Sequence, residues 1–327
     1  AQRSASLFSL DSLSALTRAA LEVRTQLQRI QPDVVHSHMS FAAAIAWLCR
    51  LRASYRLITT VHNSFDRQSI LMGLSDVVVC VSSSVLETMA RRGVPRSKLA
   101  RVWNGTRGSA RLSPTQPAPI ELARPSITSI GGLHPRKGVA DLIEAFAIAA
   151  RAGSAATLYI VGRGPYEQTY RTLAAGTGYG DRIHFLGHCD DPRPVLNSTD
   201  LFVLASHSDP FALVLLEALD AGCPIVATAV DGTPEMLEHG AAGILVPPRD
   251  PSALAAAIGS VLQDRDKQRA LRAASIRRSE SFSVAFMCEE YMKIYASQAD
   301  ARSTFEKLSA FWPRLAKARN RRQHMNV

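Results

Sequence analysis

The feature that most constrains this chain is a regular alternation of short β-branched runs with amphipathic stretches from Ile127 onward. The strand candidates span 127–132 (ITSIGG), 157–162 (TLYIVG), 182–187 (RIHFLG), 201–206 (LFVLAS), 224–228 (PIVAT) and 243–248 (GILVPP). Helix candidates such as 139–153 and 251–264 accompany them. Because the strand candidates are nearly continuous apolar runs, they suit a parallel sheet that is covered on both faces. The pattern predicts right-handed βαβ units in a doubly wound α/β domain.

The N-terminal part repeats this theme, with strand candidates at 33–38 (DVVHSH), 56–62 (RLITTVH), 76–81 (DVVVCV) and 100–105 (ARVWNG). A stretch with four prolines between Thr106 and Ser126 has the composition of a linker. The 327 residues are too many for one ordinary core and suit two domains. We therefore expect two Rossmann-like lobes with a cleft between them. The predicted parts are a first lobe at 1–107, a linker at 108–125, a second lobe at 126–281, a helix at 282–298 that crosses back to the first lobe, and a basic tail at 299–327.

Composition favours a soluble protein, because apolar residues make up 46% and charged residues 20%. The longest apolar runs fall far short of a membrane span, and the first residues lack a signal-peptide pattern. The five cysteines are scattered and no pair has zinc-ligand spacing, which is typical of reduced thiols in the cytosol. A cytoplasmic location is therefore expected.

The net charge of +10 indicates an anionic partner, either a membrane surface or a nucleic acid. Residues 298–327 contribute seven Lys/Arg against two Asp/Glu, so the excess is partly local. No nucleic-acid-binding motif is present, and nucleic acid is not an expected partner. In the tail, Phe305, Phe311 and Trp312 lie among basic residues, which suits peripheral attachment to the inner face of a plasma membrane. Because Pro313 interrupts a helix there, a disordered tail is the alternative.

In open α/β sheets, ligands bind beyond the carboxyl ends of the strands, so the residues that follow each strand are candidates for a site. After 127–132 come His134, Arg136 and Lys137, and a helix is expected from about Val139. Glycines allow close backbone approach, and cations next to a helix N-terminus favour anions. This loop is either a phosphate site or a solvated basic loop. The GxGP turn after 157–162 is predicted to be a tight strand-to-helix turn.

Two acids stand out in the stretch SDPFALVLLEALDAG, Ser208–Gly222. Asp209 before Pro210 is a good helix N-cap, so a helix is expected to begin there with free N–H groups near 211–213. Glu217 is the only polar residue between Pro210 and Leu219, and a lone buried carboxylate is costly. Glu217 therefore either pairs with an arginine or accepts hydrogen bonds from the hydroxyl groups of a ligand.

Three histidines, His36, His38 and His62, lie at or near the ends of the N-terminal strand candidates. We interpret His36 as a packing residue, and His62, at a strand–loop junction, as the better site candidate. His36 and His38 together could indicate a metal, but with no third ligand nearby the case is weak. The acids Asp190 and Asp191 after 182–187 include at least one expected helix cap.

Eight segments of the chain occur in the order that is typical of one known family. They are QPDVVHSH, TTVHNS, VWNG, GGLHPRKG, VGRGP, FLGHCDD, SDPFALVLLEALDAGCPIVAT and GTPEMLEHGAAGILVPPRDPSALAAAI. Through them, the chain from about residue 20 to 298 resembles the retaining GT-B glycosyltransferases of glycosyltransferase family 4. The resemblance implies transfer of a sugar from a nucleotide-sugar donor to a glycan or lipid-linked acceptor, with retention at the anomeric carbon. It also implies no metal or other cofactor, and it suggests a role in cell-envelope polysaccharide or lipopolysaccharide synthesis.

The resemblance further implies roles for single residues. Arg136 and Lys137 would neutralise the donor diphosphate, and Glu217 would hold the ribose hydroxyls. Asp209 stands where the family has the first Glu of an E-x7-E pair, which contacts the donor sugar. His62 matches the histidine that reaches the transferred sugar. The remaining donor-binding positions are Gly132 in the phosphate loop, the main chain around Cys189 beside the base, and the amides of Phe211, Ala212 and Leu213 beside the sugar and phosphate.

The chain departs from the family pattern at several positions. Asp209 is one methylene shorter than Glu, Ala212 replaces a glycine, and Gly132 stands where many members have an arginine. Only about thirty residues precede PDVVHSH, so the N-terminal lobe is expected to lack its first strands. These departures support a second hypothesis, a non-catalytic glycosyltransferase-like binding or scaffold protein.

Overall fold

The computed structural model of the protein describes residues 10–50, 54–107 and 118–298. The chain forms two compact units. Unit 1 comprises Ala1–Cys80, Leu86–Arg101 and Glu289–Val327, and unit 2 comprises Val81–Val85 and Val102–Cys288. The expected basic tail at 299–327 and most of the expected linker, 108–117, lie outside the described residues. Among the residues that are described, no helix is both long and apolar enough to cross a membrane.

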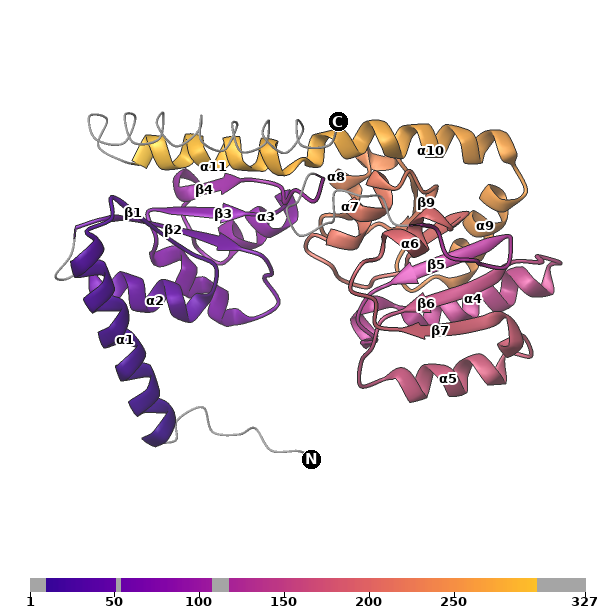
Figure 1. Ribbon diagram of the computed structural model, residues 1–327, viewed down its shortest axis with the longest axis horizontal. Helices are drawn as coiled ribbons and strands as arrows, with labels where there is room; N and C mark the ends of the chain where they lie inside the picture. Colours follow the sequence, from indigo (N-terminus) through magenta and orange to yellow (C-terminus); the bar gives the residue numbers. More distant parts are fainter. Residues whose placement is uncertain (1–9, 51–53, 108–117, 299–327) are drawn as a thin grey trace. The chain divides into compact units, whose positions relative to one another are not determined.

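Unit 1 is built on a four-stranded parallel sheet in the order β1-β2-β3-β4 (Figure 1). The four strand candidates of the N-terminal part are confirmed as β1 Val34–Ser37, β2 Arg56–Val61, β3 Val77–Cys80 and β4 Leu99–Arg101. The helical elements are α1 Leu10–Ile30, α2 Ser40–Cys49, η1 Arg67–Leu74, α3 Ser83–Arg91, η2 Arg96–Lys98 and α11 Val284–Gln298, of which α3 and α11 extend across the boundary between the units. The side chains of Leu57, Ile58, Val78 and Val79 are fully buried, as expected for a parallel sheet with both faces covered.

Unit 2 holds a six-stranded parallel sheet in the order β10-β9-β8-β5-β6-β7. Figure 1 labels β5, β6, β7 and β9 of this sheet. All six strand candidates are confirmed, as β5 Ser126–Ile130, β6 Thr157–Val161, β7 Ile183–Gly187, β8 Leu201–Leu204, β9 Ile225–Thr228 and β10 Ile244–Val246. The helical elements are η3 Pro135–Lys137, α4 Val139–Arg151, α5 Glu167–Gly176, η4 Gly180–Arg182, α6 Arg193–Asn197, α7 Leu213–Asp220, α8 Thr233–Met236, η5 Glu238–Gly240, α9 Pro251–Leu262, α10 Arg265–Ser279 and η6 Glu280–Phe282. The doubly wound α/β class predicted from the sequence is thereby confirmed.

The strand order of unit 2 reverses between β5 and β8, which are neighbours in the sheet but not in the sequence. At such a switch point the loops after the two strands run to opposite faces of the sheet and leave a crevice at its carboxyl edge. The loop after β5 contains Lys137, and the loop after β8 contains Asp209. The fold therefore brings together two loops that lie about seventy residues apart in the sequence.

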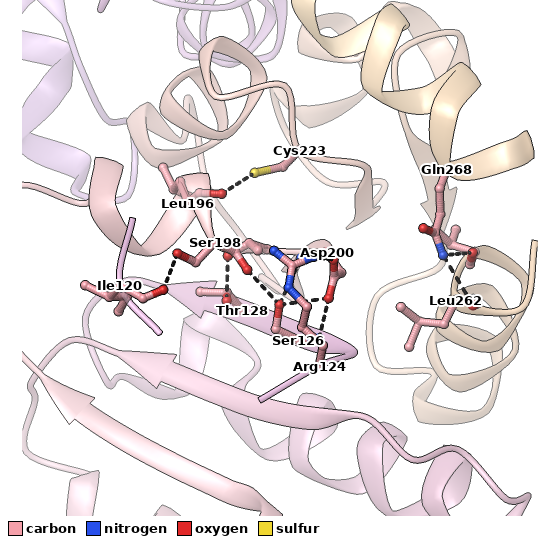
Figure 2. Close-up of polar contacts among 12 residues, drawn as sticks. Ile120, Arg124, Ser126, Thr128, Leu196, Ser198, Asp200, Cys223, Leu262 and Gln268 are labelled. Carbon is pink, nitrogen blue, oxygen red and sulfur yellow. Dashed lines mark hydrogen bonds and ion pairs between the residues drawn. The ribbon is translucent and has the colours of Figure 1, made fainter. Parts of the chain in front are cut away.

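A polar network fixes the opposite, amino end of β5 and β8 (Figure 2). The carboxylate of Asp200 accepts hydrogen bonds from the Ser126 amide at 2.8 Å and from the Arg124 guanidinium at 2.6 Å. The Ser126 hydroxyl donates to the carbonyl oxygen of Ser198 at 2.9 Å. Because both carboxylate oxygens of Asp200 and the Ser126 hydroxyl have partners, their burial carries little penalty, and the starts of the two strands are linked.

The helix expected to begin at Asp209–Pro210 begins three residues later, at Leu213. Its N-cap is Ala212 in an extended conformation, and no side chain makes a cap hydrogen bond. The expectation that Asp209 caps this helix is therefore wrong. The carboxylate of Asp209 is taken by Lys137 instead, so it is not available to the helix N–H groups.

Gly138 allows the loop after β5 to pass close to the end of β8. Alanine substitutions at Gly138 and at Gly153, which serves as the control, test this close approach. Gly138 and Gly153 both have positive φ, +64° and +93°, so Ala at either site carries left-handed strain of about 1–2 kcal/mol. Only at Gly138 would the added Cβ lie 1.8 Å from the carbonyl oxygen of Ala205. We expect Gly138→Ala to lower the Tm by several degrees more than Gly153→Ala in circular-dichroism melts. Equal shifts would contradict the close approach.

Candidate functional site

Main-chain hydrogen bonds join the loops at the carboxyl ends of β5, β6 and β8. The amide of Leu133 donates to the carbonyl oxygen of Arg163 at 3.0 Å, and the amide of His207 donates to that of Arg136 at 2.7 Å. Gly162, the first glycine of the GxGP turn, has a φ of +136°, and a Cβ there would lie 1.9 Å from the Gly131 carbonyl oxygen. The GxGP turn thus does more than turn the chain. Gly162 leaves room for the carbonyl oxygen of Gly131, and the carbonyl oxygen of Arg163 holds the loop after β5 through its hydrogen bond with Leu133.

A small pocket opens at the switch point, between the carboxyl ends of β5, β6 and β8. Its lining includes Gly131, Gly132, Lys137 and Ser206. The hydroxyl of Ser206 is buried and has no hydrogen-bond partner among the described residues. An unsatisfied buried hydroxyl is costly, so a group that a ligand brings into the pocket would relieve it. The pocket combines a cation, a spare hydroxyl and glycine backbone, which is the chemistry of an anion site.

Lys137 and Asp209 form a buried ion pair across the two loops, with 2.5 Å between Nζ and Oδ2. Their side chains are 16% and 8% exposed, so the pair is poorly screened by solvent. Arg136, next to Lys137, is exposed, and its carbonyl oxygen joins the β8 loop. The structure therefore brings Gly132, Lys137 and Asp209 together, with Arg136 at the edge of the same loop.

Two braces of the β8 loop were not predicted from the sequence. Asp231 accepts hydrogen bonds from the hydroxyl of Ser208 at 2.5 Å and from the amide of Asp209 at 2.7 Å. His207 Nε2 lies 2.7 Å from Asp141 Oδ2 on α4, and both side chains are largely buried. Asp231 adopts a positive φ of 44° and precedes a glycine, so an Asp-Gly turn signal was present but did not reveal the contact.

Glu217 lies in α7, where the chain around it is apolar and buried. Burial, together with the smaller effect of the negative charge of Asp191, raises the pKa of its carboxyl from 4.5 to about 7. Among the described residues its carboxyl has no hydrogen bond and no ion pair, so the alternative of a structural pair with an arginine is not what the structure contains. The Glu217 carboxyl can therefore accept hydrogen bonds from the donor groups of a ligand.

Asp191, in the loop after β7, contributes to the raised pKa of Glu217 through its charge. Within this loop the Cys189 thiol donates to the carbonyl oxygen of Asp191 at 2.8 Å. The Asp191 carboxylate accepts from the amide and guanidinium of Arg193, and these hydrogen bonds lower the pKa of Asp191. Asp191 thus has a hydrogen bond from Cys189 on one side and an electrostatic effect on Glu217 on the other.

The amides of Phe211, Ala212 and Leu213, which were expected to face a ligand, differ in position because α7 begins only at Leu213. Phe211 and Ala212 precede the helix and are buried, whereas Leu213 is its first residue and is 50% exposed. The Phe211 ring packs edge-on against Phe282, with 6.1 Å between the ring centroids. Of the three, the amide of Leu213 is the one at the start of a helix, where N–H groups lack intrahelical partners.

His62, the candidate in unit 1, lies directly after β2 and is exposed. Its Nε2 lies 3.0 Å from Nδ1 of His38, which follows β1. His36 is half-buried and hydrogen-bonded to Tyr295 and Thr60, as expected for a packing residue. In the described part of the chain, no group of three or more His, Cys, Asp or Glu side chains is arranged to hold a metal ion.

Two family models match the chain. Residues 115–278 match the model described as glycosyl transferases group 1, and residues 2–107 match the model described as glycosyltransferase family 4. The first model covers Lys137, Asp209 and Glu217. The second covers all four strands of unit 1.

Curated relatives of the chain include several named enzymes. It is 32% identical over 283 residues to a GDP-mannose-dependent alpha-(1-6)-phosphatidylinositol monomannoside mannosyltransferase of Mycobacterium tuberculosis, covering 78% of this chain and 73% of the relative. It is 29% identical over 291 residues to a glycogen synthase of the same species, covering 81% and 69%. A lipopolysaccharide core biosynthesis glycosyltransferase of Rhizobium meliloti is 27% identical over 290 residues, covering 85% and 80%.

Solved structures share the fold at low sequence identity. HepE of Anabaena, solved in complex with UDP, superimposes with a TM-score of 0.75 at 21% identity and covers 88% of this chain and 84% of its own. The apo form of the lipopolysaccharide outer core galactosyltransferase WaaB gives a TM-score of 0.73 at 18% identity, with 88% and 81% covered. These likenesses establish a GT-B fold for the chain.

Removing one charge of the buried ion pair should destabilise the protein. Asp209→Asn leaves the Lys137 ammonium buried without a counter-charge, and such breaks cost about 3–5 kcal/mol. The control is Asp266→Asn, which breaks the pair with Arg269, whose side chains are 82% and 80% exposed. Exposed pairs contribute ~0–1 kcal/mol. Urea unfolding should show a loss at Asp209 that is larger than at Asp266; losses of the same size would contradict a buried pair.

Glu217→Gln should stabilise the protein at pH 8 but not at pH 4.5. Because the pKa is raised, the carboxyl is neutral in the folded state at pH 4.5 and ionises as the pH rises through about 7. The wild-type protein therefore loses stability over that interval, while the amide does not titrate. The difference between the two proteins should grow to at most about 3 kcal/mol. Urea titrations at both pH values test this, and a difference independent of pH would rule it out.

Proposed function

The chain belongs to the group 1 glycosyltransferases, also described as glycosyltransferase family 4, and on this premise we propose that it transfers a sugar from a nucleotide-sugar to a hydroxyl group of a glycan or lipid-linked acceptor. Membership of the family makes the protein a glycosyltransferase enzyme. The observation that carries the finer proposal is the pocket at the switch point, which joins Lys137, glycine backbone and the spare Ser206 hydroxyl.

The donor is proposed to bind along the carboxyl edge of the sheet of unit 2. Lys137 and Arg136 supply positive charge for the diphosphate, the amide of Leu213 supplies a helix N-terminus, and Gly132 allows the backbone to approach. Glu217 accepts hydrogen bonds from the ribose hydroxyls, and the main chain at Cys189 borders the base. The names of relatives support this class of donor, since one is GDP-mannose-dependent and HepE was solved with UDP.

In the proposed reaction, the bond between the anomeric carbon and the diphosphate oxygen breaks, and a bond to the acceptor oxygen forms. The proton of the acceptor hydroxyl leaves with the nucleoside diphosphate. As the leaving group departs, the sugar gains oxocarbenium character, and negative charge grows on the diphosphate. Lys137 and Arg136 stabilise that charge, which is where fixed cations lower a barrier most. We propose retention at the anomeric carbon, with neither a protein nucleophile nor a metal.

Asp209 is proposed to contact the donor sugar while it also holds Lys137, and His62 is proposed to contact the transferred sugar. Because Asp209 is paired to Lys137 in the absence of donor, the incoming diphosphate competes with a carboxylate for the same ammonium group. The acceptor is proposed to be a cell-envelope glycan. A relative named for lipopolysaccharide core biosynthesis supports this, and residues 299–327 would attach the enzyme to an anionic membrane surface.

Donor binding can be tested with three alanine variants and isothermal titration of UDP-glucose and GDP-mannose. Lys137→Ala removes a charge-assisted contact, and Glu217→Ala removes a contact to the ribose hydroxyls. Each variant should raise the Kd about tenfold or more. The control is Lys267→Ala, because Lys267 lies on α10, outside the loops at the carboxyl edge. Unchanged affinity in both Lys137→Ala and Glu217→Ala would sink the assignment of the site.

A further inference from the structure

Three histidine side chains form a continuous row at the carboxyl ends of β1 and β2, within unit 1. The rings of His36 and His38 have centroids 4.3 Å apart, and those of His38 and His62 are stacked with centroids 5.2 Å apart. His36 lies in β1, His38 follows it, and His62 follows β2. The two strands are paired in parallel, so their carboxyl ends meet at the same edge.

The inner end of the row is firmly anchored. His36 Nδ1 lies 2.6 Å from the Tyr295 hydroxyl, and its Nε2 lies 2.8 Å from the Thr60 hydroxyl. Thr60 in turn lies 2.9 Å from the Tyr291 hydroxyl. Both tyrosines belong to the part of α11 that is in unit 1. Because each ring nitrogen of His36 has a hydroxyl partner, the ring has one orientation that satisfies both.

The outer end of the row depends on a single contact between two rings. Nδ1 of His38 lies 3.0 Å from Nε2 of His62, and both side chains are exposed. In such a bond one nitrogen donates its N–H and the other accepts, so at least one of the two rings must be neutral. The Nε2 atom of His62 is thereby committed to His38, which leaves Nδ1 of His62 for another partner.

We propose that His38 is a positioning residue for His62: it holds the exposed His62 ring in one orientation and one tautomer, and is itself held by the contact of its ring with the tilted ring of the anchored His36. This inference rests on the proposed function, in which His62 contacts the transferred sugar. A histidine at a strand end would otherwise sample several rotamers, and a displaced contact group costs rate. The contacts along the row therefore restrict the exposed His62 ring to one orientation.

The groups around the row keep it neutral near physiological pH. Burial lowers the pKa of His36 to about 4, with His38 and His62 adding to this effect. Although both side chains keep contact with solvent, partial desolvation by the surrounding protein lowers the pKa of His38, and partial desolvation together with the charge of His38 lowers that of His62. The other titratable groups that face the row or its anchors are Tyr291, Tyr295 and Cys80, and burial raises the pKa values of Tyr291 and Cys80. Double protonation of His38 and His62 would break their bond and place two cations side by side.

Kinetics on single and double variants test the proposal. The assay is nucleoside diphosphate release from UDP-glucose or GDP-mannose, whichever binds more tightly by titration. His38→Ala should lower kcat about tenfold or more and leave KM for the nucleotide-sugar within about twofold, because the nucleotide contacts are proposed in unit 2. His38→Gln should restore most of kcat, since a carboxamide can donate or accept in place of the ring. The control is His184→Ala, an exposed histidine of β7 in unit 2.

The decisive comparison is His62→Ala with the double variant His38→Ala/His62→Ala. If His38 acts through His62, the double variant is no slower than His62→Ala alone. A further loss in the double variant, or a His38→Ala variant as active as His184→Ala, overturns the positioning role. If His62→Ala retains wild-type turnover, the proposed sugar contact of His62 fails, and the positioning role falls with it. Loss in His62→Ala together with an active His38→Ala overturns the positioning role alone.

A second measurement needs no substrate. Long-range 1H–15N correlation spectra of protein labelled with 15N-histidine report the tautomer and titration of each ring. His62 should show one tautomer and an apparent pKa below the ordinary value of 6.5 in the wild type and in His38→Gln. In His38→Ala it should show mixed tautomers and a pKa closer to 6.5. An unchanged His62 spectrum in His38→Ala would overturn the proposal.

Discussion

The candidate site depends on the buried ion pair between Lys137 and Asp209, which joins the two loops at the switch point of the sheet. Either charge alone would destabilise the protein, because an unpaired charge in a poorly solvated place costs several kcal/mol, on the order of 3–5. The pair therefore fixes the position of both loops before a ligand arrives. The backbone hydrogen bond from His207 to Arg136 and the bonds from Ser208 and Asp209 to Asp231 then hold the remaining atoms of the loops.

A preformed pair also sets a condition on ligand binding. A diphosphate that approaches Lys137 competes with Asp209 for the same ammonium, and it must replace the attraction that it weakens. The proposed diphosphate carries more charge than one carboxylate, and the Ser206 hydroxyl, which has no hydrogen-bond partner among the described residues, is a further donor. Asp209, once partly released, has acceptor capacity for sugar hydroxyls. The carboxylate of Asp209 lies within hydrogen-bond distance of Lys137, so the proposed contact with the donor sugar would draw on a group that already has a partner.

The sequence predicted most of the fold. All ten strands were expected near their observed positions, and α4 begins at Val139 as expected, because apolar runs and helix periodicity are local signals. The predicted start of α7 at Asp209–Pro210 was wrong for a physical reason. Asp-Pro is a local cap signal, but the carboxylate of Asp209 is claimed by Lys137, which lies 72 residues earlier in the sequence. A contact of that separation leaves no local pattern.

Within the site, the same distinction separates what was predicted from what was not. Glycines, cations and the lone acid Glu217 could be identified as candidates because their residue types suit phosphate and hydroxyl groups. The partners Asp231, Asp141 and Asp191 could not, since each acts from another loop or helix through tertiary contact. The GxGP glycine was recognised as a turn residue, but its second task, to admit the carbonyl oxygen of Gly131, depends on the neighbouring strand.

The two sets of titrating groups change stability in opposite directions. For His36, with a pKa lowered to about 4, the favourable neutral state is complete above pH 6.5 and is lost as the pH falls. For Glu217, with a pKa raised to about 7, the favourable neutral state is complete below pH 4.5 and is lost as the pH rises through 7. Near neutral pH the histidine row is therefore intact, while Glu217 lies close to its own pKa. A ligand whose hydroxyls donate hydrogen bonds to the ionised carboxylate stabilises that form. Binding of such a ligand therefore offsets the free-energy cost of ionising Glu217, which the protein without ligand does not recover.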